Sequence, residues 1–255
     1  PLVYHDNSLT KDVLNYTDED KFDVVLMNPP YGGNEKSDVK SHFPSDMRSS
    51  ETADLFIVLI MYRLKRNGRA AVIVPDGFLF GADNTKIAIK TKLLRDFNLH
   101  TIIRLPGSIF APYTSIATNI LFFDNTCAEG APEGYSTKET WFYRLDMPEG
   151  YKHFSKTKPM KSEHCDPIRE WWNDRKEIII ADGDEKSRCY SVEDLIATDC
   201  NFDLCKFPKE DEEILPPAEL LADYFKKRKA LDHEIDKTLA EIQRILGINV
   251  NVDEL

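Results

Sequence analysis

An apolar run that stops at two consecutive prolines restricts the fold of this chain more than any other feature. Phe22–Met27 is apolar apart from one aspartate, which is the pattern of a strand buried on both faces of a sheet. Asn28-Pro29-Pro30-Tyr31 follows directly, and neither proline has an amide proton to donate to a strand ladder. We therefore predict a buried strand that ends at residue 27 and carries a stiff polar turn.

Strand and helix patterns alternate through the first half of the chain. Strands are predicted at Leu2–Tyr4, Phe22–Met27, Arg69–Val74, Leu99–Leu105 and Ala117–Phe123, and helices at Thr52–Arg66 and Lys86–Phe97, the second with Ile87 on its apolar side. This alternation predicts an α/β sheet, in which chemistry gathers at the carboxyl ends of the strands. Asp6, Asn28 and Asp76 follow such ends.

The pattern changes after about residue 125. Trp141–Asp146 and Glu177–Ala181 are predicted as strands and Glu163–Arg175 as a helix, which together would form an α+β appendage. A long helix is predicted from Pro216-Pro217 to Leu246, with apolar residues at alternating intervals of three and four, as in a short coiled coil. Its apolar seam would pack either on a partner protein or within this chain. The expected domains are residues 1–126, 127–207 and 208–255.

Composition limits the environment of the protein. The net charge of −11 argues against unspecific nucleic-acid binding by this chain alone, and no apolar run of about 18 residues predicts a membrane span. Five cysteines without a CxxC pair indicate free thiols in a reducing cytosol, so we expect a cytoplasmic protein. The histidines show no metal-ligand spacing, and no metal is expected. Because it begins at Pro1, the chain has the look of a piece cut from a larger protein.

The Asn28–Tyr31 turn suits chemistry on an aromatic amino group. The amino nitrogen of adenine is a poor nucleophile because its lone pair is delocalised into the ring. Two acceptors aimed at its hydrogens, the Asn28 side-chain oxygen and the Pro29 carbonyl oxygen, would draw that lone pair out of conjugation. Pro29 and Pro30 would hold these acceptors rigidly, and the ring of Tyr31 would stack on a base turned out of the duplex. A simple strand-ending loop is the alternative.

With these residues in place, Phe22–Gly33 resembles the catalytic motif of amino-methyltransferases. The whole chain is similar to the modification (methylase) subunit of type I restriction–modification systems. The similarity continues through Ala53-Asp54-Leu55, Gly68–Gly77, Leu105–Phe110, Lys156–Met160 and Asn201–Leu204, and into the final helix.

The resemblance implies an enzyme that methylates adenine N6 with S-adenosylmethionine. Its DNA would be double-stranded, with the target adenine flipped out, and its partners would be a specificity subunit and a nuclease/translocase subunit. Asp6 matches the acidic residue that faces the cofactor adenine in relatives, although capping its own turn is equally expected. Phe110 is a weaker candidate for the base pocket. For Asp76 and Phe78 we expect roles in packing before roles in catalysis.

One departure from the family pattern concerns the cofactor. The chain has no Gly-x-Gly turn in its first half, and the acidic residue that should follow a second strand is also missing. We therefore expect a Rossmann-like methyltransferase sheet that lacks its first strands, with the appendage and the long helix. The missing strand would leave a Val24- and Leu26-rich edge uncovered. The chain alone is then expected not to methylate.

Two other functions stay open at this level. The same turn suits a protein glutamine amide or a guanine amine in RNA, and a truncated subunit could serve as a non-catalytic scaffold. The segment Tyr151–Lys158 interleaves aromatic and basic residues, which fits either phosphate contact with stacking or a solvated loop.

Overall fold

The computed structural model describes residues 5–180, 183–205 and 217–247. The chain divides into two compact units, Pro1–Pro208 and Lys209–Leu255. The strand predicted at Leu2–Tyr4 lies outside the described residues, as does Pro216.

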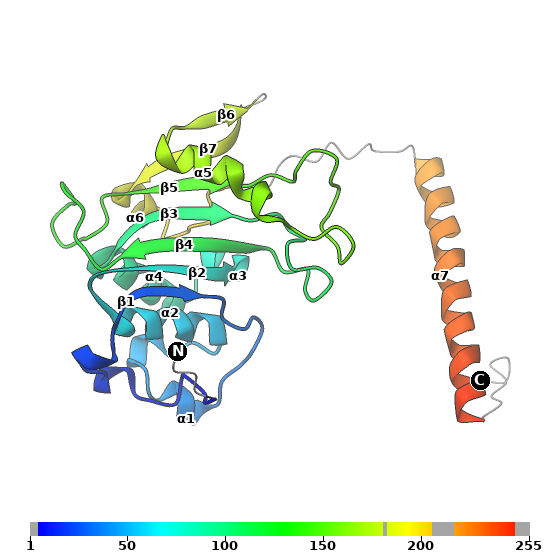
Figure 1. The fold of residues 1–255 in the computed structure, drawn as a ribbon, viewed down its shortest axis with the longest axis horizontal. Coiled ribbons are helices and arrows are strands. Elements are labelled where there is room, and N and C mark those ends of the chain that lie inside the picture. The colour runs from blue at the N-terminus through cyan, green and yellow to red at the C-terminus, as the bar shows by residue number, and fades with distance from the viewer. Residues whose placement is uncertain (1–4, 181–182, 206–216, 248–255) are drawn as a thin grey trace. The chain divides into compact units, whose positions relative to one another are not determined.

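The first unit is built on one mixed sheet with the strand order β1-β2-β4-β3-β5-β7-β6 (Figure 1). The strands are β1 (Phe22–Met27), β2 (Leu64–Pro75), β3 (Asn98–Arg104), β4 (Thr118–Asp124), β5 (Glu139–Arg144), β6 (Ile178–Ile180) and β7 (Asp184–Ser191). β1 pairs in parallel with β2 and β3 with β5, whereas β4 runs antiparallel between β2 and β3. The carboxyl ends of β1, β2, β3 and β5 therefore meet at one edge of the sheet.

Helices connect and cover the strands. They are α1 (Ser37–Lys40), α2 (Thr52–Arg63), α3 (Asp76–Phe80), α4 (Asn84–Asp96), α5 (Asp166–Asn173) and α6 (Val192–Ala197), with 3₁₀ turns at Val13–Asn15, Asp18–Asp20, Ser45–Met47 and Ser162–Cys165. α2 and α4 contribute to the main core with alternate residues of the strands, such as Leu121 and Phe123 of β4. A smaller core on the opposite face packs Ile103 and Tyr143 against Trp171 of α5.

The expectation that β1 is buried on both faces is wrong. Val24 is 49% exposed and Leu26 is 79% exposed, because β1 is the first strand of the sheet and pairs only with β2 among the described strands. The missing neighbour strand was expected to leave Val24 and Leu26 uncovered at the edge of the sheet, and both side chains are exposed as expected.

Several predicted boundaries also shift. α2 ends at Arg63, three residues before the predicted helix end at Arg66. β2 begins at Leu64 and runs through Asn67 and Gly68, both of which are hydrogen-bonded to Asn125 (2.9 and 2.8 Å). On α4, Lys86 and Lys90 are buried, while Ile87 is only half-buried.

The second half of the chain extends the same sheet. β5 and β6 lie where strands were predicted, α5 covers the core of the predicted helix, and β7 and α6 were not predicted. Residues 139–191 continue the sheet of β1–β4 and do not form a separate sheet. The predicted domain boundary near residue 126 therefore stays a proposal.

The second unit contains α7 (Pro217–Leu246), which has the bounds that the sequence predicts. Among the helices that the structure describes, none is both long and apolar enough to cross a membrane.

Candidate active site at the carboxyl edge of the sheet

The Asn28–Tyr31 turn follows β1 at the carboxyl edge of the sheet. Pro29 is buried, whereas Asn28 and Pro30 are exposed. The chain after the turn is held against the start of α2, since the Thr52 amide donates to the Gly33 carbonyl oxygen (3.0 Å). A Cβ on Gly33 would lie 2.7 Å from Thr52 Oγ1, so a larger residue at this position would require the Thr52 side chain to shift. The turn is thus fixed at both ends, by the strand and by α2.

Tyr31 connects two parts of the site. Its hydroxyl donates a hydrogen bond to Asn28 Oδ1, and its ring lies 6.1 Å from the ring of Phe110, tilted by 57°. Burial raises the pKa of Tyr31 to about 12, so the hydroxyl stays protonated at neutral pH. The structure therefore brings Asn28, Tyr31 and Phe110 together, as a cluster of one amide oxygen and two aromatic rings.

Phe110 reaches Tyr31 from the loop between β3 and β4. This loop is tied back to the sheet by the Leu105 amide, which donates to the Thr118 carbonyl (3.0 Å). Ser108 Oγ accepts a hydrogen bond from the Phe154 amide (2.7 Å), which joins the loop to the segment after β5. The sequence offered no signal for this link, because Ser108 and Phe154 are 46 residues apart.

Asp6 does not join this cluster. Its side chain is exposed and accepts a hydrogen bond from the amide of the next residue, Asn7 (2.8 Å). Among the described residues, no hydrogen bond, ion pair or ring contact connects Asp6 with residues 28–31.

Asp76 and Phe78 have packing roles in this structure. Asp76 accepts a hydrogen bond from Asn119 Nδ2 (2.5 Å) and pairs with the buried Arg104 (3.5 Å). Arg104 also pairs with Asp203, so it ties the segment after α6 to the sheet. Phe78 is completely buried in the main core.

A buried ionic cluster beside the loop after the turn is absent from the sequence predictions. Lys86 Nζ lies 3.0 Å from Asp54 Oδ2 and also forms an ion pair with Glu51. The backbone of Glu51 pairs with that of Asn34 in an isolated antiparallel β-bridge. Burial raises the pKa of Asp54, and the Ser49 hydrogen bond and the Lys86 charge only partly oppose this. Burial lowers the pKa of Lys86, but Glu51 and Asp54 outweigh it and the net shift is upward. The available sequence signal was that Lys86 lies three residues before Ile89 and seven before Leu93, on the same face of the predicted helix.

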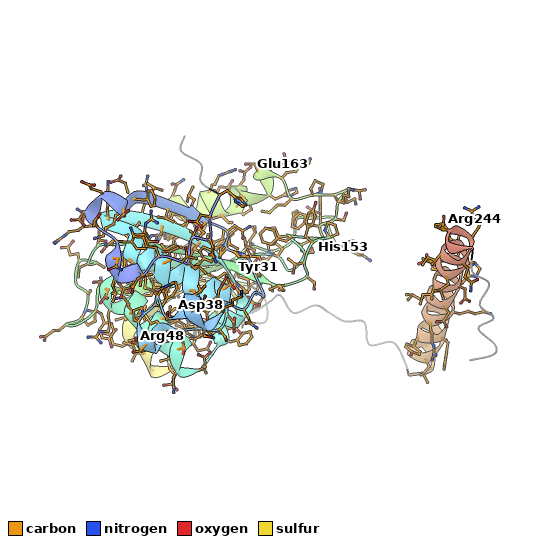
Figure 2. The ribbon with its side chains drawn as sticks, turned by 90° about the horizontal axis from the view of Figure 1, so that it is seen from below. Tyr31, Asp38, Arg48, His153, Glu163 and Arg244 are labelled. Carbon is orange, nitrogen blue, oxygen red and sulfur yellow. The ribbon has the colours of Figure 1, made fainter. Side chains whose placement is uncertain are left out.

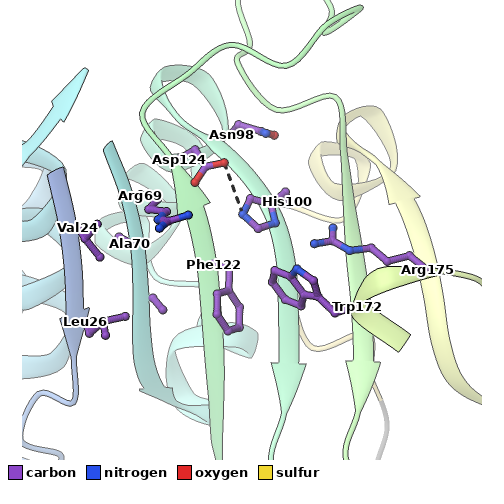
Figure 3. A pocket seen from close by; sticks show the side chains of 11 residues that line it. Val24, Leu26, Arg69, Ala70, Asn98, His100, Phe122, Asp124, Trp172 and Arg175 are labelled. Atoms are coloured by element: carbon purple, nitrogen blue, oxygen red, sulfur yellow. Dashed lines mark ion pairs between the residues drawn. The ribbon is translucent and has the colours of Figure 1, made fainter. Parts of the chain in front are cut away.

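A cavity of about 650 Å³ lies elsewhere in the first unit. Figure 3 shows it as an open recess on the sheet face between β1 and α5. His100 Nε2 lies 3.7 Å from Asp124 Oδ2 there, and Arg175 lies 4.3 Å from the ring centroid of Trp172. Burial lowers the pKa of His100. The recess contains none of the predicted site residues, so its size does not make it the candidate active site.

The described residues do not fit a complete S-adenosylmethionine site. The chain has no Gly-x-Gly turn to approach the cofactor, and the contact of Asp6 with the cofactor adenine stays a proposal. The part of the chain that the structure describes also contains no group of His, Cys, Asp and Glu side chains able to hold a metal ion. The cluster at the edge of the sheet can therefore position an amino group and a flat ring, but it does not contain a donor site.

Comparison with known proteins identifies the family. Residues 2–214 match the family model described as N-6 DNA Methylase. The chain is 41% identical over 247 residues to the type I restriction enzyme EcoEI methylase subunit of Escherichia coli, covering 96% of this chain and 47% of that protein. It is 31% identical over 185 residues to the EcoKI methylase subunit of Escherichia coli (strain K12), covering 65% of this chain and 33% of that protein.

Solved structures agree with this result. A modification subunit from Vibrio vulnificus, assigned to a type I restriction enzyme, superposes with a TM-score of 0.66 at 42% identity, covering 74% of this chain and 38% of that chain. The EcoKI M protein, at 24% identity and a TM-score of 0.61, covers 93% of this chain and 53% of that chain and shares the fold. The chain spans about half or less of the length of these relatives. The family model covers most of the chain, which therefore belongs to the N-6 DNA methylase family.

Proposed function

We propose that this chain supplies the adenine-binding half of an adenine-N6 DNA methyltransferase, within the modification subunit of a type I restriction–modification system. The observation that carries the proposal is the cluster of Asn28, Tyr31 and Phe110 at the carboxyl edge of the sheet. Membership of the N-6 DNA methylase family supports adenine N6 as the atom that is methylated.

The turn positions the amino group of the target base. Asn28 Oδ1 and the Pro29 carbonyl oxygen accept its two hydrogens, which leaves the nitrogen lone pair free to attack a methyl group. The two prolines and the contact between Gly33 and Thr52 hold the acceptors before the base arrives. Because Tyr31 donates to Asn28 Oδ1 in this structure, the base amino group replaces the Tyr31 hydroxyl when it binds.

The rings of Tyr31 and Phe110 form the walls of the proposed base pocket. A base inside a duplex cannot reach the turn, so the adenine must flip out of the stack. Stacking on one aromatic ring contributes about 1–3 kcal/mol, which offsets part of the cost of unstacking the base. No general base is required, since proximity and orientation supply most of the rate.

S-adenosylmethionine is the proposed methyl donor, and its site requires residues other than those described here. We also retain the roles proposed for residues 1–126 in catalysis, 127–207 as an appendage and 208–255 in subunit contact. The proposed partners are double-stranded DNA, a specificity subunit and a nuclease/translocase subunit. The EcoEI and EcoKI relatives are named as methylase subunits of type I restriction enzymes, which supports this assembly.

Calorimetry tests the division of the active site. The 255-residue chain is titrated with S-adenosylmethionine, and the full modification subunit of this proposal, called the longer subunit below, is titrated in parallel. We expect no binding by the chain and stoichiometric binding by the longer subunit. Tight stoichiometric binding by the 255-residue chain would overturn the proposed division.

Product analysis tests the substrate. The longer subunit, assembled with its copurifying partners, is incubated with methyl-labelled S-adenosylmethionine and either duplex DNA, total RNA or a protein extract. We expect the label in N6-methyladenine of DNA. Label in a glutamine amide or an RNA guanine would replace this proposal by one of the other amino-group substrates. Complex formation without any methylation would favour a scaffold role.

A further inference from the structure

A basic segment lies at the same edge of the sheet as the candidate site. Residues 151–161 contain Lys152, Lys156, Lys158 and Lys161 and no acidic residue, in a chain whose net charge is −11. All four lysines are exposed. Neither Lys152 nor Lys156 forms an ion pair with any residue that the structure describes, although Lys161 pairs with Glu163 (3.2 Å). This segment thus concentrates positive charge within a chain that is acidic as a whole.

This basic segment, residues 151–161, is built around a buried aromatic residue. Phe154 is 2% exposed, and its ring lies 5.6 Å from the rings of both Tyr151 and His164. Reciprocal backbone hydrogen bonds between Ser155 and Lys158 (3.0 and 3.1 Å) close a tight turn. The lysines therefore extend from an anchored loop, which distinguishes this segment from a solvated charged loop without internal contacts.

The basic segment is joined directly to the proposed base pocket. The Phe154 amide donates to Ser108 Oγ (2.7 Å), and Ser108 lies two residues before Phe110, which faces Tyr31. In Figure 1 the loops after β1, β3 and β5 leave the same edge of the sheet, and Figure 2 shows Tyr31 and His153 toward that edge. The loop that carries the lysines is therefore joined through Ser108 to the loop that carries Phe110.

We propose that the basic segment binds the phosphate backbone of the nucleic acid next to the flipped nucleotide. Lysine ammonium groups are suited to this contact because phosphates dominate the affinity of proteins for DNA and position the protein on the duplex. The segment would hold the strand in register while Tyr31 and Phe110 hold the base. This inference rests on the proposed function, because it assumes a DNA substrate.

Salt-dependent binding tests the proposal. Lys152, Lys156 and Lys158 are changed together to Gln in the longer subunit, assembled with its copurifying partners. DNA affinity is measured by fluorescence anisotropy between low and high KCl. We expect the slope of log affinity against log salt to fall by about one per lysine, equally for cognate and unrelated duplexes. The KM for DNA should rise while kcat at saturating DNA stays near wild type.

A matched variant removes three exposed charges from the opposite edge of the sheet. Arg66, Arg95 and Lys138 lie near the amino-terminal ends of β2, β3 and β5, and their change to Gln should leave the salt slope unaltered. If the lysine variant and this control bind DNA alike while the wild type methylates DNA, the proposal for the basic segment is wrong and the proposed function stands. If the lysine variant instead loses a copurifying subunit at unchanged DNA affinity, the segment contacts protein. If the wild type methylates no DNA, the proposed function itself fails.

Discussion

At the scale of single residues, Tyr31 has two roles that substitution can separate. Changing Tyr31 to Ala removes the stacking ring, and we expect binding of a flipped base to weaken by about 5- to 150-fold, the equivalent of 1–3 kcal/mol. Changing Tyr31 to Phe removes only the hydroxyl that occupies Asn28 Oδ1, so base binding should stay close to wild type.

The measurement for both variants is the fluorescence of 2-aminopurine placed at the target position of a duplex. Tyr113, which is 92% exposed on the loop between β3 and β4, provides a control, and its change to Ala should have no effect. Equal loss in the Phe and Ala variants would show that the hydroxyl, and not the ring, matters for base binding.

Cys205 predicts a dependence of stability on alkaline pH. Burial raises the pKa of this thiol to about 12 in the folded chain, whereas an exposed thiol ionises near pH 9. Its contribution to stability is therefore fully present below about pH 9 and is lost as the pH rises toward 12. The loss is roughly 1.4 kcal/mol per pH unit in that window.

Urea unfolding at several values between pH 8 and pH 11 measures this effect. The Cys205 to Ala variant should lose stability less steeply with pH than the wild type. Changing the exposed Cys127 to Ala controls for loss of a thiol, and an identical slope in both variants would contradict the prediction.

At the scale of secondary structure elements, the Lys86–Asp54 pair joins α4 to α2. Changing Lys86 to Met leaves a completely buried carboxylate without its cation, and we expect a loss of about 3–5 kcal/mol in the free energy of unfolding. Changing Asp54 to Asn in the same chain should recover part of this loss, because the amide is neutral and still accepts from Ser49.

Lys92 on the same helix provides the matched control. It pairs with Asp96 near the surface, and its change to Met should cost no more than about 1 kcal/mol. Chemical denaturation of the wild type and the three variants is the measurement. A Lys86 effect as small as the Lys92 effect would show that the buried pair contributes little.

The sequence predicted the bounds of an element correctly where a single local signal defined them. β1 and α7 have the predicted bounds because prolines end the first and a regular apolar seam defines the second. β7 was missed because Asp184–Ser191 is mostly polar and shows no apolar alternation. Lys86 and Lys90 were missed as buried residues because lysine is usually exposed and their partners, Asp54 and the Leu79 and Gly81 carbonyls, lie outside α4.

For the candidate site, only the contacts between residues close in sequence could be predicted. Asn28 and Tyr31 are three residues apart, so their contact follows from the turn itself. Phe110 was a weak candidate, since its approach to Tyr31 depends on the strand order of the sheet. The link from Ser108 to Phe154 depends on that order as well and had no sequence signal.

At the scale of the whole molecule, α7 predicts a contact with the specificity subunit. Its apolar seam includes Leu231 and Ile235, which are 58% and 51% exposed. We expect that changing both to Asp, or deleting residues 217–255, abolishes copurification with the specificity subunit, because charged side chains cannot be buried in an apolar interface.

His233 and Ala240 lie on the opposite side of the helical repeat, and changing both to Asp adds two carboxylates without altering the seam. This control should retain the specificity subunit. Loss of the subunit in both double variants, or retention in both, would refute docking through the seam.

The proposed role of the turn after β1 is to hold the amino group of an adenine in DNA. Its most direct test is methyl transfer to duplex DNA by the longer subunit with its copurifying partners, comparing wild type with the Asn28 to Ala variant. We predict that kcat falls by about 10²–10³, as when one preorganised polar group is lost from an active site, while DNA affinity is retained. An Asn28 to Ala variant that binds DNA and forms N6-methyladenine at the wild-type rate would contradict the claim.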